Sequence, residues 1–335
     1  MRLWKCVVVV MVLALGAFYA AEPRVAAQAD EAQTGRGAGR GAGRGRGEGR
    51  GPGPREVWAA QPIPETPYTP PNRLIWRLSE IIASHKGQPS WRQPVVKTRD
   101  FEAEFIQMAP GEKTQTQFFS DDRAFWVVES GQIRFTMAGN EPFVASKGFL
   151  VQAAPSMDYS MEVVGDTPAL RFEVRPAGEM PSYPASETPP TIKGWKYVKT
   201  SITDRGKYDE VNKPYLDFLK DIVAANGRSM NFVFDGHTSA HVIRGPGGPT
   251  PPDTNFGHFH ENMVEFWIVL EGQLDVLVSG EKLVTGEVGD VILAPEERWH
   301  RATTHGSGPS TRLAITPRLK EGQVHYAQPG GGGGQ

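Results

Sequence analysis

The chain of 335 residues contains one sequence pattern twice, with the two copies about 141 residues apart. Several matches in the same order at a near-constant offset indicate a duplicated module rather than a coincidence. We therefore predict two tandem domains, residues 72–177 and 213–318, connected by residues 178–212. The matching segments are residues 125–133 (FWVVESGQI) with 266–274 (FWIVLEGQL), 78–83 with 219–224, Arg171 with Arg312, Pro176 with Pro317 and, at an offset of 140, Pro155 with Pro295.

Each copy begins with a helical pattern and continues as short β-rich runs. Apolar residues at helical spacing follow Asn72 and predict a helix over residues 72–85, with Asn72 as its N-cap. In the second copy, Pro214 marks the start of the matching helix and Asn226-Gly227 marks its end. Turn residues then recur about every 8–12 positions, which is typical of a sandwich or barrel. We predict an all-β fold of two tandem double-stranded β-helix (jelly-roll) barrels, each preceded by a short α-helix.

The second copy contains a cluster of metal-ligating residue types. His258 and His260 are two positions apart, so they face the same side of a strand, and Glu265 begins the next strand. His300 arrives from a distant strand and completes the set. Three imidazoles and one carboxylate suit one divalent transition metal ion, namely Fe, Mn, Ni, Cu or Zn. The only cysteine, Cys6, excludes both a disulfide framework and a cysteine-ligated metal site.

These residues resemble the two motifs of the cupin superfamily, G-x5-H-x-H-x3,4-E-x6-G and G-x5-P-x-G-x2-H-x3-N. The first motif matches from His258 to Gly272 and the second from Gly289 to His300. The chain departs from the motifs at turn positions and at the last position, which are Pro252, Glu297 and Thr304. Because the two copies are similar, the resemblance extends over about 245 residues, and the chain is similar to bicupins. The metal motif is present only in the C-terminal barrel.

The first copy lacks the metal ligands. The offset of 141 places Gln117, Phe119 and Ala124 at the positions of His258, His260 and Glu265, and the offset of 140 places Ser160 at that of His300. We interpret the first copy as a structural or dimerising barrel. A dimerising role would make the protein a homo-oligomer. A metal-free ligand pocket is the alternative.

Other residues are candidates for a substrate pocket around the metal. Strand alternation adds Trp267, two positions after Glu265, and Arg298, two positions before His300. A core role is favoured for Trp267, because the first copy keeps Trp126 without a metal to serve. His241 is a further candidate, because the offsets of 140 and 141 give it Phe101 and Asp100, which lie in a differently composed segment. Arg312 is weaker, because the first copy retains Arg171.

Three functions fit this site. The resemblance implies a metal-dependent dioxygenase that acts on a small aromatic or enol-type molecule, in which the ligand Glu265 doubles as a base. The alternatives are a non-oxidative enzyme (an isomerase, decarboxylase or lyase acting on a sugar or organic acid) and a non-catalytic binding protein. Each requires a small-molecule ligand. Fold alone does not choose among them.

The N-terminal region predicts export to the periplasm or the extracellular space. Charged residues precede a 16-residue apolar run, and Ala27-Gln28-Ala29 follows as a cleavage site, so residues 1–29 are predicted to be a signal peptide that leaves no membrane span. Residues 30–71 are predicted to be a linker, first disordered and Gly/Arg-rich and then Pro-rich, and residues 319–335 a Gly-rich tail. The segment 57–335 carries a net charge of −6, because the segment 1–56 carries +4 and the whole chain −2. An acidic body excludes a nucleic-acid-binding domain.

Overall fold

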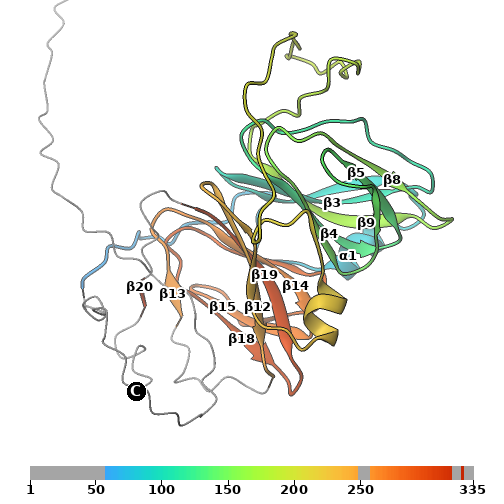
Figure 1. The fold of residues 1–335 in the computed structure, drawn as a ribbon. Helices are drawn as coiled ribbons and strands as arrows, with labels where there is room; N and C mark the ends of the chain where they lie inside the picture. Colours follow the sequence, from blue (N-terminus) through green and yellow to red (C-terminus); the bar gives the residue numbers. More distant parts are fainter. Residues whose placement is uncertain (1–56, 248–256, 319–325, 328–335) are drawn as a thin grey trace, which may run out of the picture.

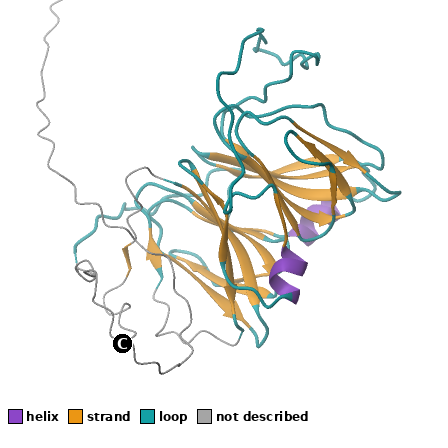
Figure 2. Ribbon diagram, viewed as in Figure 1, coloured by secondary structure: helices purple, strands orange, loops and turns teal. Residues whose placement is uncertain are grey.

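The computed structural model describes residues 57–247, 257–318 and 326–327. The predicted signal peptide, the Gly/Arg-rich tract and most of the Gly-rich tail lie outside these residues. Figures 1 and 2 show two β-rich modules side by side, with two short helices. In the described part of the chain, no helix is long and apolar enough to span a membrane.

The N-terminal module is a barrel of two antiparallel sheets. Its larger sheet has the strand order β10-β7-β4-β9-β3-β2, and its smaller sheet has the order β6-β5-β8. The strands of this module are β2 (Trp91–Lys97), β3 (Phe101–Met108), β4 (Ala124–Ser130), β5 (Ile133–Met137), β6 (Phe143–Ala145), β7 (Phe149–Ala153), β8 (Tyr159–Val163) and β9 (Ala169–Pro176).

The C-terminal module repeats this arrangement, which confirms the predicted pair of jelly-roll barrels. Its larger sheet has the order β1-β17-β14-β19-β12-β11, and its smaller sheet has the order β16-β15-β18-β13-β20. Its strands are β11 (Met230–Phe234), β12 (Thr238–Gly245), β13 (His258–Phe259), β14 (Glu265–Glu271), β15 (Gln273–Val278), β16 (Val284–Gly286), β17 (Val291–Ala294), β18 (His300–His305), β19 (Ser310–Pro317) and β20 (Tyr326–Ala327).

The two modules exchange edge strands. Strand β1 (Ile75–Trp76) lies at the start of the first module but pairs with β17 of the second. Strand β10 (Tyr215–Asp217) lies at the start of the second module but pairs with β7 of the first. Each barrel therefore has its larger sheet completed by a strand that belongs, by the repeat, to the other barrel.

The exchange explains why the predicted helices are too long. Helix α1 is Leu78–Ser84, and Arg77, not Asn72, is its N-cap residue. The Asn72 side chain bonds the backbone of Lys97 instead. The second helix, η1 (Leu219–Ala224), is a single π-helical segment rather than an α-helix. Its predicted end is confirmed, since the Gly227 amide donates to the Ile222 carbonyl at 2.7 Å.

The larger sheets of the two barrels pack against each other. One face of β4 places Phe125 and Val127 in a core shared with the second module, while its other face places Trp126 inside the first barrel. Phe125 contacts Phe232 across this junction, with ring centroids 6.4 Å apart. A strand that is buried on both faces has a continuous apolar sequence instead of an alternating one. The sequences of β4 and β14 both show this pattern.

Candidate metal centre

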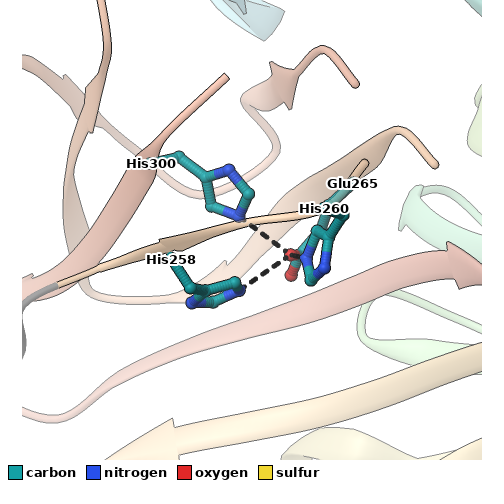
Figure 3. Close-up of side chains that lie close together, drawn as sticks. All are labelled: His258, His260, Glu265 and His300. Carbon is teal, nitrogen blue, oxygen red and sulfur yellow. Dashed lines mark hydrogen bonds and ion pairs between the residues drawn. The ribbon is translucent and has the colours of Figure 1, made fainter. Parts of the chain in front are cut away.

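Four predicted ligands meet inside the C-terminal barrel (Figure 3). His258 lies on β13, directly opposite His300, which begins β18 in the smaller sheet. His260 follows β13 and shares the face of His258, as the two-residue spacing requires. Glu265 begins β14 of the larger sheet, so its carboxylate faces the histidines from across the barrel. One ligand atom from each residue lies within 4.8 Å of the others.

The distances from the Glu265 carboxylate to the three histidines are close to those between ligands of one metal ion. Oxygen Oε2 of Glu265 is 3.7 Å from Nε2 of His258, 3.1 Å from Nε2 of His260 and 3.2 Å from Nε2 of His300. Two ligand atoms that each lie about 2.1 Å from one ion, at roughly a right angle, are about 3 Å apart. Three imidazole nitrogens and a carboxylate oxygen form a donor set for a transition metal ion.

The four ligands differ in how deeply they are buried. His260 and His300 are 3% and 2% exposed, and Glu265 is 8% exposed. The side chain of His258 is 32% exposed. His258 is therefore the most exposed of the four residues, although its Nε2 atom is buried.

The charge states suit metal binding. Burial raises the pKa of Glu265, but hydrogen bonds from the three histidines outweigh this and hold its pKa well below its usual range. Burial lowers the pKa of His260, although its hydrogen bond to Glu265 opposes that change. At neutral pH the carboxylate is therefore ionised and the His260 ring is neutral, which are the forms that ligate a metal.

Outer contacts fix the orientation of two ligands. Nδ1 of His300 donates to the carbonyl oxygen of Arg298 at 3.0 Å, so a bound metal ion would take the place of the Nε2 proton that His300 shares with Glu265. The indole N–H of Trp267 donates to Oε1 of Glu265 at 2.8 Å. Trp267 is fully buried, as its predicted core role requires, and it also contacts a ligand.

His241 lies on the same inner face of the larger sheet. It pairs with Ala314, which in turn pairs with Trp267. Its Nδ1 is 2.6 Å from the side-chain oxygen of Asn231. Burial, and then the positive charge of Arg312, lower the pKa of His241. The structure therefore places His241 and Arg312 inside the barrel. His241 and Trp267 lie at the same level of the sheet, on either side of Ala314.

The side chain of Arg298 is engaged away from the cluster. Its guanidinium donates to the Ser279 carbonyl, lies 3.2 Å from Glu281 and 3.6 Å from Glu65, and stacks over the ring of Tyr68. Alternation placed Arg298 on the ligand face, but the residue belongs to the turn before β18, where alternation does not apply. Only its carbonyl reaches His300.

The first barrel confirms the loss of ligands but corrects one position. Tyr159 pairs with Met137 as His300 pairs with Val278, so Tyr159, not Ser160, is the counterpart of His300. Gln117, the counterpart of His258, donates to the Tyr159 hydroxyl at 3.2 Å. In the described residues, the only group suited to a metal is the one in the second barrel.

A second correction concerns His241. The strand pairing gives it an ionisable counterpart, Glu104, which pairs with Glu173 as His241 pairs with Ala314. Glu173 accepts the indole N–H of Trp126 at 2.7 Å and lies 3.3 Å from Arg171. A buried ion pair therefore occupies the first barrel next to its tryptophan, where the second barrel has the methyl group of Ala314.

Comparisons with known proteins agree with this architecture. Residues 240–316 match the family model of the cupin domain. The structure of salicylate 1,2-dioxygenase from Pseudoaminobacter salicylatoxidans with gentisate is similar, with a TM-score of 0.54 and 11% identity over 76% of this chain and 84% of that chain. Oxalate decarboxylase from Bacillus subtilis has a TM-score of 0.45 and 11% identity over 79% of this chain and 80% of that one. No curated protein sequence matches the chain.

Proposed function

We propose that the chain is a metal-dependent dioxygenase acting on a small aromatic or enol-type molecule, because residues 240–316 match the cupin domain model and the two-barrel fold is similar to that of salicylate 1,2-dioxygenase. The observation that carries the proposal is the buried cluster of His258, His260, Glu265 and His300. Four protein ligands leave coordination positions open on an ion that prefers six, and open positions distinguish catalytic from structural sites. A redox-active ion held there would supply electron transfer to dioxygen.

The residues of this chain have distinct roles in such a reaction. Glu265 is the only carboxylate of the cluster, so it is the group that would accept the proton of a substrate hydroxyl, although its lowered pKa makes it a weak base. The three histidines are neutral donors in this proposal. Burial of His260 and His300 excludes bulk water from the inner side of the site.

The inner face of the barrel offers a place for an acidic substrate. Arg312 pairs with Val269 and Ile243 in the row next to Trp267 and His241. Salicylate and gentisate, the compounds named for the similar dioxygenase structures, are aromatic hydroxy acids. A substrate of this class would place its carboxylate toward Arg312 and its hydroxyl toward the metal.

The decisive experiment combines metal analysis with oxygen uptake. Protein purified from its native compartment is analysed for bound metal, and apoprotein is reloaded with Fe(II), Mn(II), Ni(II), Cu(II) or Zn(II). Each form is tested against salicylate, gentisate, catechols, flavonols, keto acids and oxalate. We expect oxygen uptake with an aromatic or enol-type substrate. Release of CO₂ without oxygen uptake would favour the non-oxidative alternative, and no turnover with any metal would favour a binding protein.

A pair of variants tests the site itself. His260→Ala removes a buried ligand, so metal content should fall to background. Phe119→Leu changes the corresponding position of the first barrel and should leave metal content at the wild-type value. If His260→Ala retains full metal content, the ligand assignment is wrong.

Export is part of the same proposal. The charged start, the 16-residue apolar run and the Ala27-Gln28-Ala29 site support secretion of a mature protein that begins at Asp30. Outside the cytoplasm Fe(II) is hard to keep loaded, and the Irving–Williams order favours Cu and Zn. N-terminal sequencing of protein from each cell fraction tests this, and an intact Met1 terminus in the cytoplasmic fraction would contradict it.

A further inference from the structure

The Pro-rich segment before the first module lies across the metal-bearing barrel. We call residues 61–68 the strap. The sequence predicted a linker here, but the strap packs against the turn that leads to His300. Its contacts with the second barrel are Gln61 Nε2 to the Glu297 carbonyl at 3.3 Å, Thr66 Oγ1 to Glu297 Oε2 at 3.1 Å, Tyr68 hydroxyl to the Leu293 carbonyl at 3.0 Å, Glu65 to Arg298 at 3.6 Å and Glu65 to the Ser279 hydroxyl.

Glu297 is the first link between the strap and the ligands. It has a φ of 67°, in the left-handed region that favours glycine, and it occupies the internal glycine position of the second cupin motif. The strap binds both its carbonyl and its carboxylate. Its own amide donates to the carbonyl of the ligand His260 at 2.6 Å. A glycine would adopt this backbone more easily but would offer the strap no carboxylate.

Arg298 is the second link. Its side chain is only 6% exposed and lies between Glu281, Glu65 and the Tyr68 ring, whose centroid is 5.0 Å from the guanidinium carbon. Its carbonyl holds the Nδ1 proton of His300. The strap therefore reaches two of the four ligands, His260 and His300, through adjacent residues of one turn.

The repeat supplies an internal control for these contacts. The segment before the second module crosses the first barrel in the same way, and its Tyr208 is the counterpart of Tyr68 at an offset of 140. The Tyr208 hydroxyl donates to the carbonyl of Gln152, as that of Tyr68 donates to the carbonyl of Leu293. The first barrel holds no ligand set among its described residues, so loss of the Tyr208 contact affects packing alone.

We propose that the strap is a positioning element of the metal centre, which holds the turn at residues 295–298 and thereby orients His260 and His300. This inference rests on the proposed metal site. Neither Glu65 nor Tyr68 touches the ligands, so both act through Arg298, whereas Gln61 and Thr66 act through Glu297. A detached strap leaves all four ligands in place but releases the backbone that aims two of them.

The test compares metal binding by the full mature chain in matched variants. The double variant Glu65→Gln/Tyr68→Phe weakens the strap, and Tyr208→Phe makes the corresponding change on the first barrel. Apoprotein is titrated with Cu(II) or Zn(II) against a competing chelator, and the Cu(II) form is examined by electron paramagnetic resonance. We expect about tenfold weaker binding and a broadened spectrum for the double variant. Tyr208→Phe should match wild type in both measurements.

The outcomes separate this inference from the proposed function. If wild-type protein binds no metal, the metal site itself is wrong. If wild type binds metal and the double variant matches it in affinity and spectrum, the strap has no positioning role. Thr66→Val is measured alongside, because it removes only one hydroxyl and should leave the fold intact. It removes the bond to Glu297 and should also weaken metal binding. Restored affinity in Glu65→Asp would indicate that the charge opposite Arg298 is what matters.

Discussion

Trp267 and Trp126 occupy the same position of the repeat but donate to different carboxylates. The indole of Trp267 bonds the ligand Glu265 on its own strand, whereas that of Trp126 bonds Glu173 on the neighbouring strand β9. One core side chain that both copies keep therefore supports a metal ligand in one barrel and an ion pair in the other. A contact of this kind raises the affinity of a metal site by orienting the ligand.

Replacement of this indole should separate the two roles. Trp267→Phe removes the bond to Oε1 of Glu265 and should weaken metal binding about 10–100-fold. Trp126→Phe removes a similar volume from the first barrel and should lower the Tm without changing metal affinity. Competition titration and thermal unfolding measure the two effects. Equal metal affinity in both variants would show that the indole N–H does not support the site.

Glu129 is a buried acid away from the metal. It is the second-last residue of β4, and its carboxylate lies beside Gly289 in the turn before β17 of the other barrel. Burial raises its pKa from 4.5 to about 7, and the nearby Lys147 offsets only part of that shift. Because the folded pKa exceeds the unfolded one, the folded chain gains stability from the protonated acid at low pH and loses it as the pH rises through about 7.

The expected consequence is a pH-dependent effect of Glu129→Gln. At pH 5 the variant and the wild type should have similar stability, since both side chains are neutral in the folded chain. At pH 8 the variant should be more stable, by about 1–3 kcal/mol. Thermal unfolding across this range tests the idea. A Tm difference that is the same at pH 5 and pH 8 would mean that the acid titrates normally.

The ligands could be predicted from sequence because they lie within short motifs on strands with a fixed alternation. The contacts of Arg298 could not, because its partner Glu65 precedes the first module in the chain and the side chain projects from a turn.

The counterpart of His300 was misplaced by one residue, because Pro155 and Pro295 suggested that the offset changes from 141 to 140. The strand pairing shows that the offset stays at 141 up to the end of β17 and β7.

At the scale of elements, helix α1 depends on the opposite barrel for its start. The Leu78 amide donates to Oδ1 of Asp290 at 3.0 Å, and Arg77 and the Glu287 amide both bond Oδ2. Asp290 precedes β17, so the side chain that satisfies the first amide of the helix comes from the second module. The contact of the helix start with Asp290 therefore holds the neighbouring strand β1 close to β17.

Asp290→Ala should weaken this junction. It leaves the amides of Leu78 and Glu287 without their acceptor, while Arg77 keeps its bond to the Thr285 carbonyl, so the free energy of unfolding should fall by about 1–3 kcal/mol. Asp217→Ala removes the side chain that accepts the Lys220 amide at the other helix, where the groups are exposed, and should cost less. Chemical denaturation of both variants tests the difference. An equal loss would show that the contact between the modules adds nothing beyond a local cap.

The strand content and the duplication were accessible to sequence patterns, but the helix boundaries were not. Residues 72–77 have helical spacing, yet Ile75 and Trp76 pair with Ile292 and Val291. A local pattern does not contain the register of a partner strand that lies in the other module. The exchange of β1 and β10 therefore emerges only when both sheets are in place.

At the scale of the whole molecule, the two barrels form one cooperative body. Their larger sheets share a core, and each edge strand crosses to the other barrel. The connecting residues 178–212 include exposed side chains, among them Trp195 and Val198. The connection is therefore less important for holding the barrels together than the shared core.

Cleavage within the connection tests this cooperativity. Limited trypsin treatment at Lys193, Lys196 or Lys199, which are exposed, should leave two fragments that remain associated and retain the metal. By contrast, residues 213–318 produced alone should fail to give a soluble, metal-binding barrel. Size-exclusion chromatography with metal analysis measures both results. Separation of the nicked fragments under native conditions would show that each barrel is independent.

The crossed edge strands also set an order of assembly during synthesis. Strand β10 follows the first barrel closely in the chain, so the edge of β7 is covered soon after that barrel has been made. Strand β1 must wait until β17 has been made, late in the second module. Long-range pairing of this kind is slow and leaves strand edges open to aggregation. The segment that leads into the folded body is thus among the last to dock, so the contacts of the strap with the turn before His300 form late.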